Sequence, residues 1–111
     1  MALQDLIDDL QNATGPDRKL DAAIAKIVAI AQRSEVVTAM PPSDPSKVPH
    51  YTRLLDHAYA LAQAISPSNM GGCSWEEGKG TAKLNDGPYI QAATPALALC
   101  IAALTELRRP N

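Results

Sequence analysis

Ten consecutive residues, Pro95–Leu104, carry no polar side chain. Thr94 and Pro95 are typical of a helix start, because threonine can cap the first turn and proline needs no N–H partner there. We therefore expect a helix from Pro95 to about Arg108. A helix that is apolar all round must be covered on several sides. It is expected to be the central element, between a β-hairpin and the other helices; alternatively, one side of it forms a homo-oligomer interface.

Apolar residues at helical spacing predict two helices in the first third of the chain. Residues 2–13 place four aliphatic side chains on one stripe, with acidic and amide side chains opposite. A second helix is expected from about residue 17 to residue 33, after a start that resembles a capping box. There Thr14 is expected to accept an N–H of the first turn, and Asp17 to face the positive helix end. The two helices are expected to form an αα-hairpin.

Four of the nine prolines lie between Val36 and His50, where neither helical nor strand periodicity survives. This segment is expected to be a loop. A third helix is expected from Tyr51 or Thr52 to Ile65, and the sequence after Ile65 ends it. The side chains expected to face inward are those of Leu54, Leu55, Ala58, Leu61, Ala62 and Ile65.

Residues beyond 70 change to the period of β-strands. Residues 73–77 and 81–85 flank the tight Gly78-Lys79-Gly80, which predicts a β-hairpin. Asp86-Gly87 is a second turn signal, and residues 89–92 are either a third strand or an extended approach to the last helix.

Composition sets the class. The chain has 111 residues, 46% of them hydrophobic, and no phenylalanine, so its core must be built from Leu, Ile, Val and Ala. We predict a single α+β domain over residues 1–111, with helices packed mainly on one side of a small antiparallel sheet. Its parts are a helical hairpin (1–35), a Pro-rich loop (36–50) and a helix–β-hairpin–helix unit (51–109).

Charge and hydropathy argue against several classes of protein. The formal net charge of −2 gives no basic excess for direct nucleic-acid binding. The first residues lack the basic and apolar regions of a secretory signal, and Pro95–Leu104 is about half the roughly 20 residues that cross a bilayer. We expect a cytoplasmic protein without a membrane partner, whose two cysteines are thiols rather than a disulfide.

Three segments resemble small proteins of bacteriophages and prophages. They are the helix start at Tyr51–Asp56, the hairpin that contains Trp75, and Thr94–Leu104 at the end. This order is similar to the phage α/β/α-sandwich type of domain, and Ala13–Ile24 resembles a leader segment found on such proteins. The matching positions are caps and core residues, so no catalytic residue can be transferred. The resemblance implies a small phage-encoded protein in the cytoplasm of an infected or lysogenic bacterial host, of a kind that often binds host machinery.

No constellation of residues predicts catalysis, a metal or a cofactor. His50, His57, Cys73 and Cys100 include suitable zinc ligands but lack the close pair spacing of a zinc site. His57 and Cys73 are separated by 16 positions, and nothing in the sequence brings them together as a nucleophile and its base. Gly78-Lys79-Gly80 lacks the rest of a phosphate-binding loop. We therefore expect a protein that is not an enzyme and holds no cofactor.

Two surfaces are candidates for partner binding. The first is acidic: Asp5, Asp8 and Asp9, with Asp17 and Asp21 further along, give the first 21 residues a negative balance. Such a run is usually a solvated helix face. In its functional interpretation, it docks on a basic groove of a host protein that handles nucleic acid.

The second surface combines an aromatic residue with charges: Trp75, Glu77, Lys79 and Lys83. Trp75 is also the only tryptophan in a chain without phenylalanine. We expect it to be mainly a core anchor, and recognition of a partner is the alternative.

The function expected from these features is binding without catalysis. The leading hypothesis is a phage-encoded protein that occludes a host antiviral defence protein, such as a CRISPR-Cas component. One alternative is an oligomeric sponge for a small nucleotide signal, with Lys79, Lys83, Arg108 and Arg109 as phosphate contacts. Another is a structural or assembly factor of the phage particle.

Overall fold

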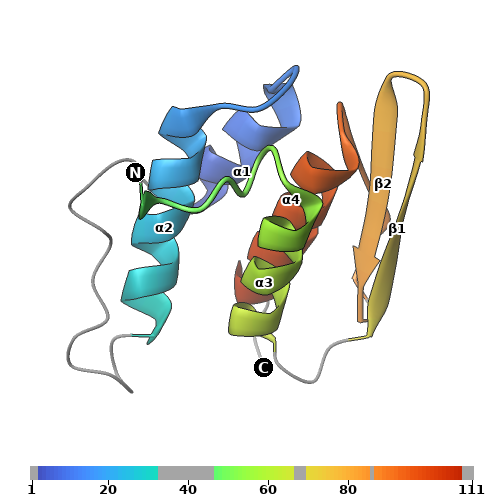
Figure 1. Cartoon of the computed structure of the whole chain (residues 1–111). Helices are drawn as coiled ribbons and strands as arrows, with labels where there is room; N and C mark the ends of the chain where they lie inside the picture. Colours follow the sequence, from blue (N-terminus) through green and yellow to red (C-terminus); the bar gives the residue numbers. More distant parts are fainter. Residues whose placement is uncertain (1–2, 33–46, 67–69, 86, 109–111) are drawn as a thin grey trace.

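The computed structural model describes residues 3–32, 47–66, 70–85 and 87–108 and confirms the α+β class. Figure 1 shows the helices of these described residues on one side of a three-stranded sheet. The elements are α1 (Leu3–Asn12), α2 (Arg18–Gln32), α3 (Leu55–Ile65), β1 (Gly71–Glu76), β2 (Lys79–Leu84), β3 (Ile90–Ala92) and α4 (Pro95–Arg108). Of the two interpretations of residues 89–92, the third strand is the one observed. Most of the predicted Pro-rich loop lies outside the described residues.

The sheet is antiparallel, with strand order β1-β2-β3. Glu76 pairs with Lys79, so the hairpin turn consists of the two residues Glu77 and Gly78. Gly78 has a φ of 81°, in the region that favours glycine. The predicted turn at Gly78-Lys79-Gly80 therefore begins one residue too late and ends two residues too late, and Lys79 and Gly80 belong to β2.

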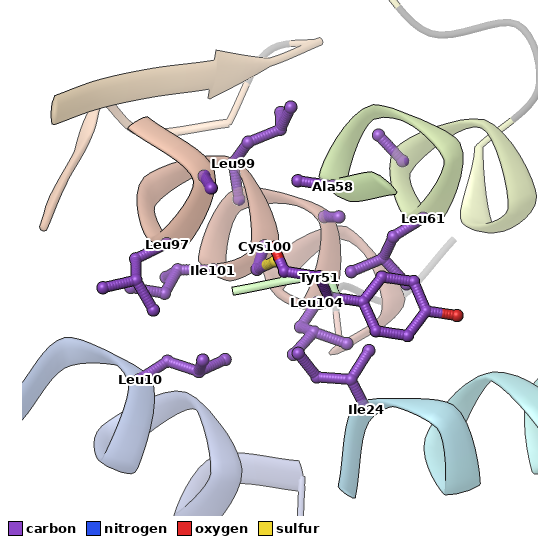
Figure 2. Packing of buried hydrophobic residues seen from close by; sticks show 14 of the residues in the cluster. Leu10, Ile24, Tyr51, Ala58, Leu61, Leu97, Leu99, Cys100, Ile101 and Leu104 are labelled. Atoms are coloured by element: carbon purple, nitrogen blue, oxygen red, sulfur yellow. The ribbon is translucent and has the colours of Figure 1, made fainter. Parts of the chain in front are cut away.

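Helix α4 is the centre of the molecule, as its lack of polar side chains predicts. Every residue from Ala96 to Thr105 is buried within the single chain. Figure 1 shows α4 between the N-terminal helices α1 and α2 and the sheet, with α3 beside it, and Figure 2 shows its Leu97, Ile101 and Leu104 directed toward helices α1 and α2. A homo-oligomer through this helix stays a prediction. None of the helices among the described residues is long and apolar enough to cross a membrane.

The start of α4 confirms the predicted cap. The Leu97 N–H donates to the Thr94 hydroxyl oxygen at 3.1 Å. Strand β2 approaches this point so closely that a Cβ at Gly80 would overlap the backbone of Thr94 and Pro95. Gly80 is therefore required by a close contact between strand and helix.

The N-terminal helices pack against each other, and the predicted stripe of α1 is buried at Leu6, Ile7 and Leu10. The cap of α2 differs from the prediction. The Asp17 carboxylate, and not Thr14, accepts from the backbone N–H groups of Lys19 (2.8 Å) and Leu20 (3.4 Å). Asp17 directly precedes the first helical residue, so its carboxylate reaches both N–H groups and also faces the positive helix end.

Helix α3 begins at Leu55, later than predicted, because residues 51–53 form a turn. Thr52 is held in this turn by a buried carboxylate, and the Tyr51 carbonyl accepts from the Cys100 thiol at 3.2 Å. Because the helix begins later, Leu54 and Leu55 point outward. Both are exposed, whereas the sequence predicts that they face inward. The rest of the predicted stripe packs against or lies within the core: Ala58, Leu61, Ala62 and Ile65.

Candidate functional site

A buried polar cluster that sequence reasoning missed joins α2 to the turn before α3. The Asp21 side chain is 1% exposed and accepts from the Thr52 N–H and hydroxyl, each at 2.8 Å. Arg18 donates to the other Asp21 oxygen at 2.9 Å and to the Val48 carbonyl at 3.1 Å. Among the described residues, no buried side-chain nitrogen or oxygen atom lacks a hydrogen bond. Because its atoms already bond within the chain, this cluster stabilises the fold and offers no free group for chemistry.

The residues weighed as zinc ligands are distributed over three parts of the fold. The His50 N–H donates to Nδ1 of His57 at 2.8 Å, and the two rings lie 6.1 Å apart between centroids. His57 is therefore bonded to backbone. Cys73 lies in β1, Cys100 lies in α4, and both are free thiols. No three His, Cys, Asp or Glu side chains gather as a metal site in the part of the chain that the structure describes.

The two thiols should differ sharply in reactivity. Burial raises the pKa of the Cys100 thiol, and the Asp21 carboxylate raises that pKa further. Cys100 therefore stays protonated at neutral pH, whereas Cys73 is only partly buried. A thiol reagent at pH 7.5 should modify one cysteine in the folded chain and both in urea. A Cys73→Ser variant should show no reactive thiol until it unfolds, and rapid labelling of that folded variant would contradict this prediction.

Among the described residues, helices cover one face of the sheet and leave the other uncovered. Successive residues of β2 point to opposite sides, and Ala82 and Leu84 are buried on the side of α4. The opposite side we call the outer face, and it is formed by Ser74, Glu76, Lys79, Thr81, Lys83 and Gln91. Two of the predicted partner-binding residues, Lys79 and Lys83, are thereby brought to one surface.

An open groove of about 490 Å³ lies on the outer face. Its floor is low because Gly72, Ser74 and Thr81 have small side chains or none. Met70 and Tyr89 border it and are 76% and 75% exposed. The Lys83 amine lies 4.8 Å from the centroid of the Tyr89 ring, a cation–π contact that holds the lysine beside the groove. The sequence pattern marked Lys83 but not Met70 or Tyr89.

Trp75 is not a core anchor, because it is 72% exposed. It lies directly opposite Gly80, on the side of the sheet that faces α4. At that point β2 touches the backbone of the α4 start, so there is no room for an indole between strand and helix. Trp75 instead forms one wall of a second groove, of about 430 Å³, together with Leu55 and Pro95. Glu77 is exposed in the adjacent turn, and Lys79 forms a 2.9 Å ion pair with Glu76.

The acidic surface is smaller than expected. Asp5, Asp8 and Asp9 are exposed on α1, but Asp17 caps α2 and Asp21 is buried. Figure 1 shows α1 and the β1–β2 hairpin on opposite sides of α4, so the two predicted surfaces do not form one site.

The fold and its surfaces define a small α+β protein with a central apolar helix and one sheet face that the described helices leave uncovered. Comparison with protein-family models, with curated proteins and with solved structures finds no match to this chain.

Proposed function

We propose that this chain is a binding protein without catalytic activity and that it contacts a partner protein through the outer face of its sheet. The observation that carries the proposal is the open groove between Met70 and Tyr89, on a face that the described helices leave uncovered. An antiparallel sheet can expose one face to water, but such a face is typically polar throughout. Two large apolar side chains, each about three quarters exposed, are unusual there.

The chemistry of the groove favours a protein partner. Methionine and aromatic side chains are enriched in protein interfaces, and tyrosine is among the residue types that contribute most to binding. The Lys83 amine adds a positive charge that is held in place by the Tyr89 ring. A complementary partner surface would present apolar side chains to Met70 and Tyr89 and a carboxylate to Lys83.

The resemblance to phage proteins makes a host defence complex the first class of partner to test. In this proposal the protein works in the cytoplasm of the bacterial host and occludes a component of such a complex, for example of a CRISPR-Cas system.

Substitutions on two faces test the proposal directly. Partners are isolated from a bacterial host lysate with the whole chain, and each purified partner is then titrated by calorimetry. Tyr89→Ala and Lys83→Glu should weaken binding at least about tenfold, because loss of an interface anchor costs more than about 1.4 kcal/mol. Asp8→Lys and Asp9→Lys, on the opposite side of α4, are the matched controls and should change the affinity less than about twofold.

Three results would count against the proposal. If the α1 variants lose the partner and the outer-face variants keep it, the acidic surface is the binding site. If Trp75→Ala alone abolishes binding, the contact is the groove beside Leu55 and Pro95. If no partner is found and the protein does not restore phage growth on defended hosts, the chain is not an inhibitor of defence.

A nucleotide ligand is the second candidate, and the Lys83–Tyr89 pair favours it. An aromatic ring can stack on a base while a nearby amine contacts a phosphate. Calorimetry of the same variants against cyclic and linear nucleotides separates the two functions. A response that is lost in Tyr89→Ala supports the nucleotide sponge, and a flat response supports the protein partner. The third expectation, a role in particle assembly, predicts that the protein is recovered with virions.

A further inference from the structure

We propose that strand β1 pairs with β1 of a second copy of this chain, antiparallel and in one register, with the twofold axis at Cys73. The contact joins two three-stranded sheets into one sheet of six strands. This contact differs from the homo-oligomer through α4 that the sequence suggested as an alternative, because the apolar residues of α4 are already buried inside the chain. The proposal goes beyond the proposed function because it concerns the backbone edge of the sheet and not its outer face.

The two edges of the sheet are unequal. β3 has three residues and packs against α1 and α4. β1 has six residues, five of them exposed, and is an edge strand. Natural proteins protect long edge strands with lysine, proline or a bulge. Gly71–Glu76 contains neither lysine nor proline, carries its one charge at its last residue, Glu76, and pairs with β2 without a bulge. A long unprotected edge is a template for another strand.

The ladder between β1 and β2 determines which backbone groups point to the open edge. The Asn85 N–H donates to the Met70 carbonyl, so this pair is hydrogen-bonded. Pairs in an antiparallel ladder alternate between hydrogen-bonded and non-hydrogen-bonded. The residues at 72, 74 and 76 therefore bond to β2, whereas Gly71, Cys73 and Trp75 direct their N–H and C=O groups away from it.

Gly71, Cys73 and Trp75 of one copy can pair with the same three residues of a second copy in only one antiparallel register. Gly71 then lies opposite Trp75 of the second copy, and Cys73 lies opposite Cys73. The three pairs exchange up to about six backbone hydrogen bonds. Any shift of the axis along the strand leaves at least one outward-pointing residue without a partner.

The side chains of β1 also fit this register. A Cβ at Gly71 would overlap the Lys83 carbonyl and Leu84, so this position must be glycine and holds no side chain against an incoming indole. The exposed Trp75 of one copy lies over Gly71 of the other, a favourable arrangement for a strand glycine. Glu76 falls opposite residue 70 and not opposite itself, so the register avoids direct repulsion between like charges.

The dimer would change the outer face as well. Gly72 lies opposite Ser74 of the second copy, so the floor of small residues continues across the twofold axis. The two grooves then meet in one continuous surface, bordered at both ends by Met70 and Tyr89.

Charged substitutions at the axis test the register. Sedimentation velocity of the whole chain, from about 10 to 300 µM, should show a concentration-dependent dimer, since a pairing of this size is at the small end of specific interfaces. Cys73→Lys and Cys73→Glu each place like charges directly opposite each other and should weaken the dimer at least about tenfold. An equimolar mixture of the two variants should restore it, and Cys73→Ser should leave it unchanged.

A second measurement uses the native cysteine. A bismaleimide with a reach of about 8 Å should link two copies through Cys73, because directly opposed residues lie about 5.5 Å apart between Cα atoms. Cys100 is buried and cannot substitute for it. A wild-type chain that stays monomeric over the whole range, or a mixture that does not restore the dimer although both variants melt like the wild type, would overturn the proposal. These measurements need only the purified chain, so their failure is separate from failure of the proposed function.

Discussion

Replacing Ile101 with aspartate should leave most of the chain unfolded. Ile101 is completely buried in the middle of α4, where it lies in the hydrophobic core and faces the other helices. An unpaired buried charge costs more than about 4 kcal/mol, which is comparable to the total stability of a small domain. Urea denaturation followed by circular dichroism measures the loss.

The control for this substitution is Ile101→Val, which removes one methylene group without adding charge. It should cost about 1 kcal/mol and leave a cooperative transition. A cooperative Ile101→Asp transition within a few degrees of the wild-type melting temperature would show that α4 is not covered as the structure has it.

Asp21→Ala should have the second-largest effect, a loss of about 3 kcal/mol. The substitution leaves the buried Thr52 N–H without its acceptor and removes one of the hydrogen-bond partners of Arg18. The Arg18 side chain is 44% exposed, so water can solvate it, and most of the loss comes from the backbone group. The free energy of unfolding is measured by urea titration. Lys26→Ala, at an exposed position of the same helix, is the matched control and should change stability by less than about 0.5 kcal/mol.

The Asp21→Asn variant separates shape from charge. Its amide keeps an oxygen for Thr52 but loses the negative charge that faces Arg18, so its stability should fall between that of the wild type and that of Asp21→Ala. Equal losses for both variants would mean that the ion pair, and not the bond to Thr52, dominates the contribution of Asp21.

Features that depend on nearby residues were predictable from the sequence. The absence of polar groups in Pro95–Leu104 predicts the central helix, since no other position satisfies an apolar surface on all sides. The Thr94 cap and the β1–β2 hairpin were also predictable, because the residues that form each of them are close together in the sequence. The predicted hairpin turn was displaced by one residue at its start and two at its end, because both Gly78 and Gly80 are compatible with a turn and only the approach of α4 distinguishes them.

Features that depend on distant segments were not predictable. Thr52 and Asp21 are 31 positions apart, and nothing in either neighbourhood indicates that they meet. Their contact creates the turn at residues 51–53 and so moves the start of α3 to Leu55. The exposure of Trp75 has a similar origin, since the space it would need is occupied where β2 meets Pro95. From hydropathy alone, Leu54 and Leu55 at the start of α3 and the Trp75 side chain were all expected in the interior, and all three are exposed.

The position of α4 also determines when this molecule can fold during synthesis. Helices α1 and α3 and strand β2 all rest on α4, yet α4 follows each of them in the chain. While the ribosome is still translating the preceding segments, their aliphatic side chains lack the surface of α4, and only partial contacts such as that between α1 and α2 can form. The core of the described residues is therefore completed only after α4 has emerged, and until then the nascent chain stays open to chaperones and proteases.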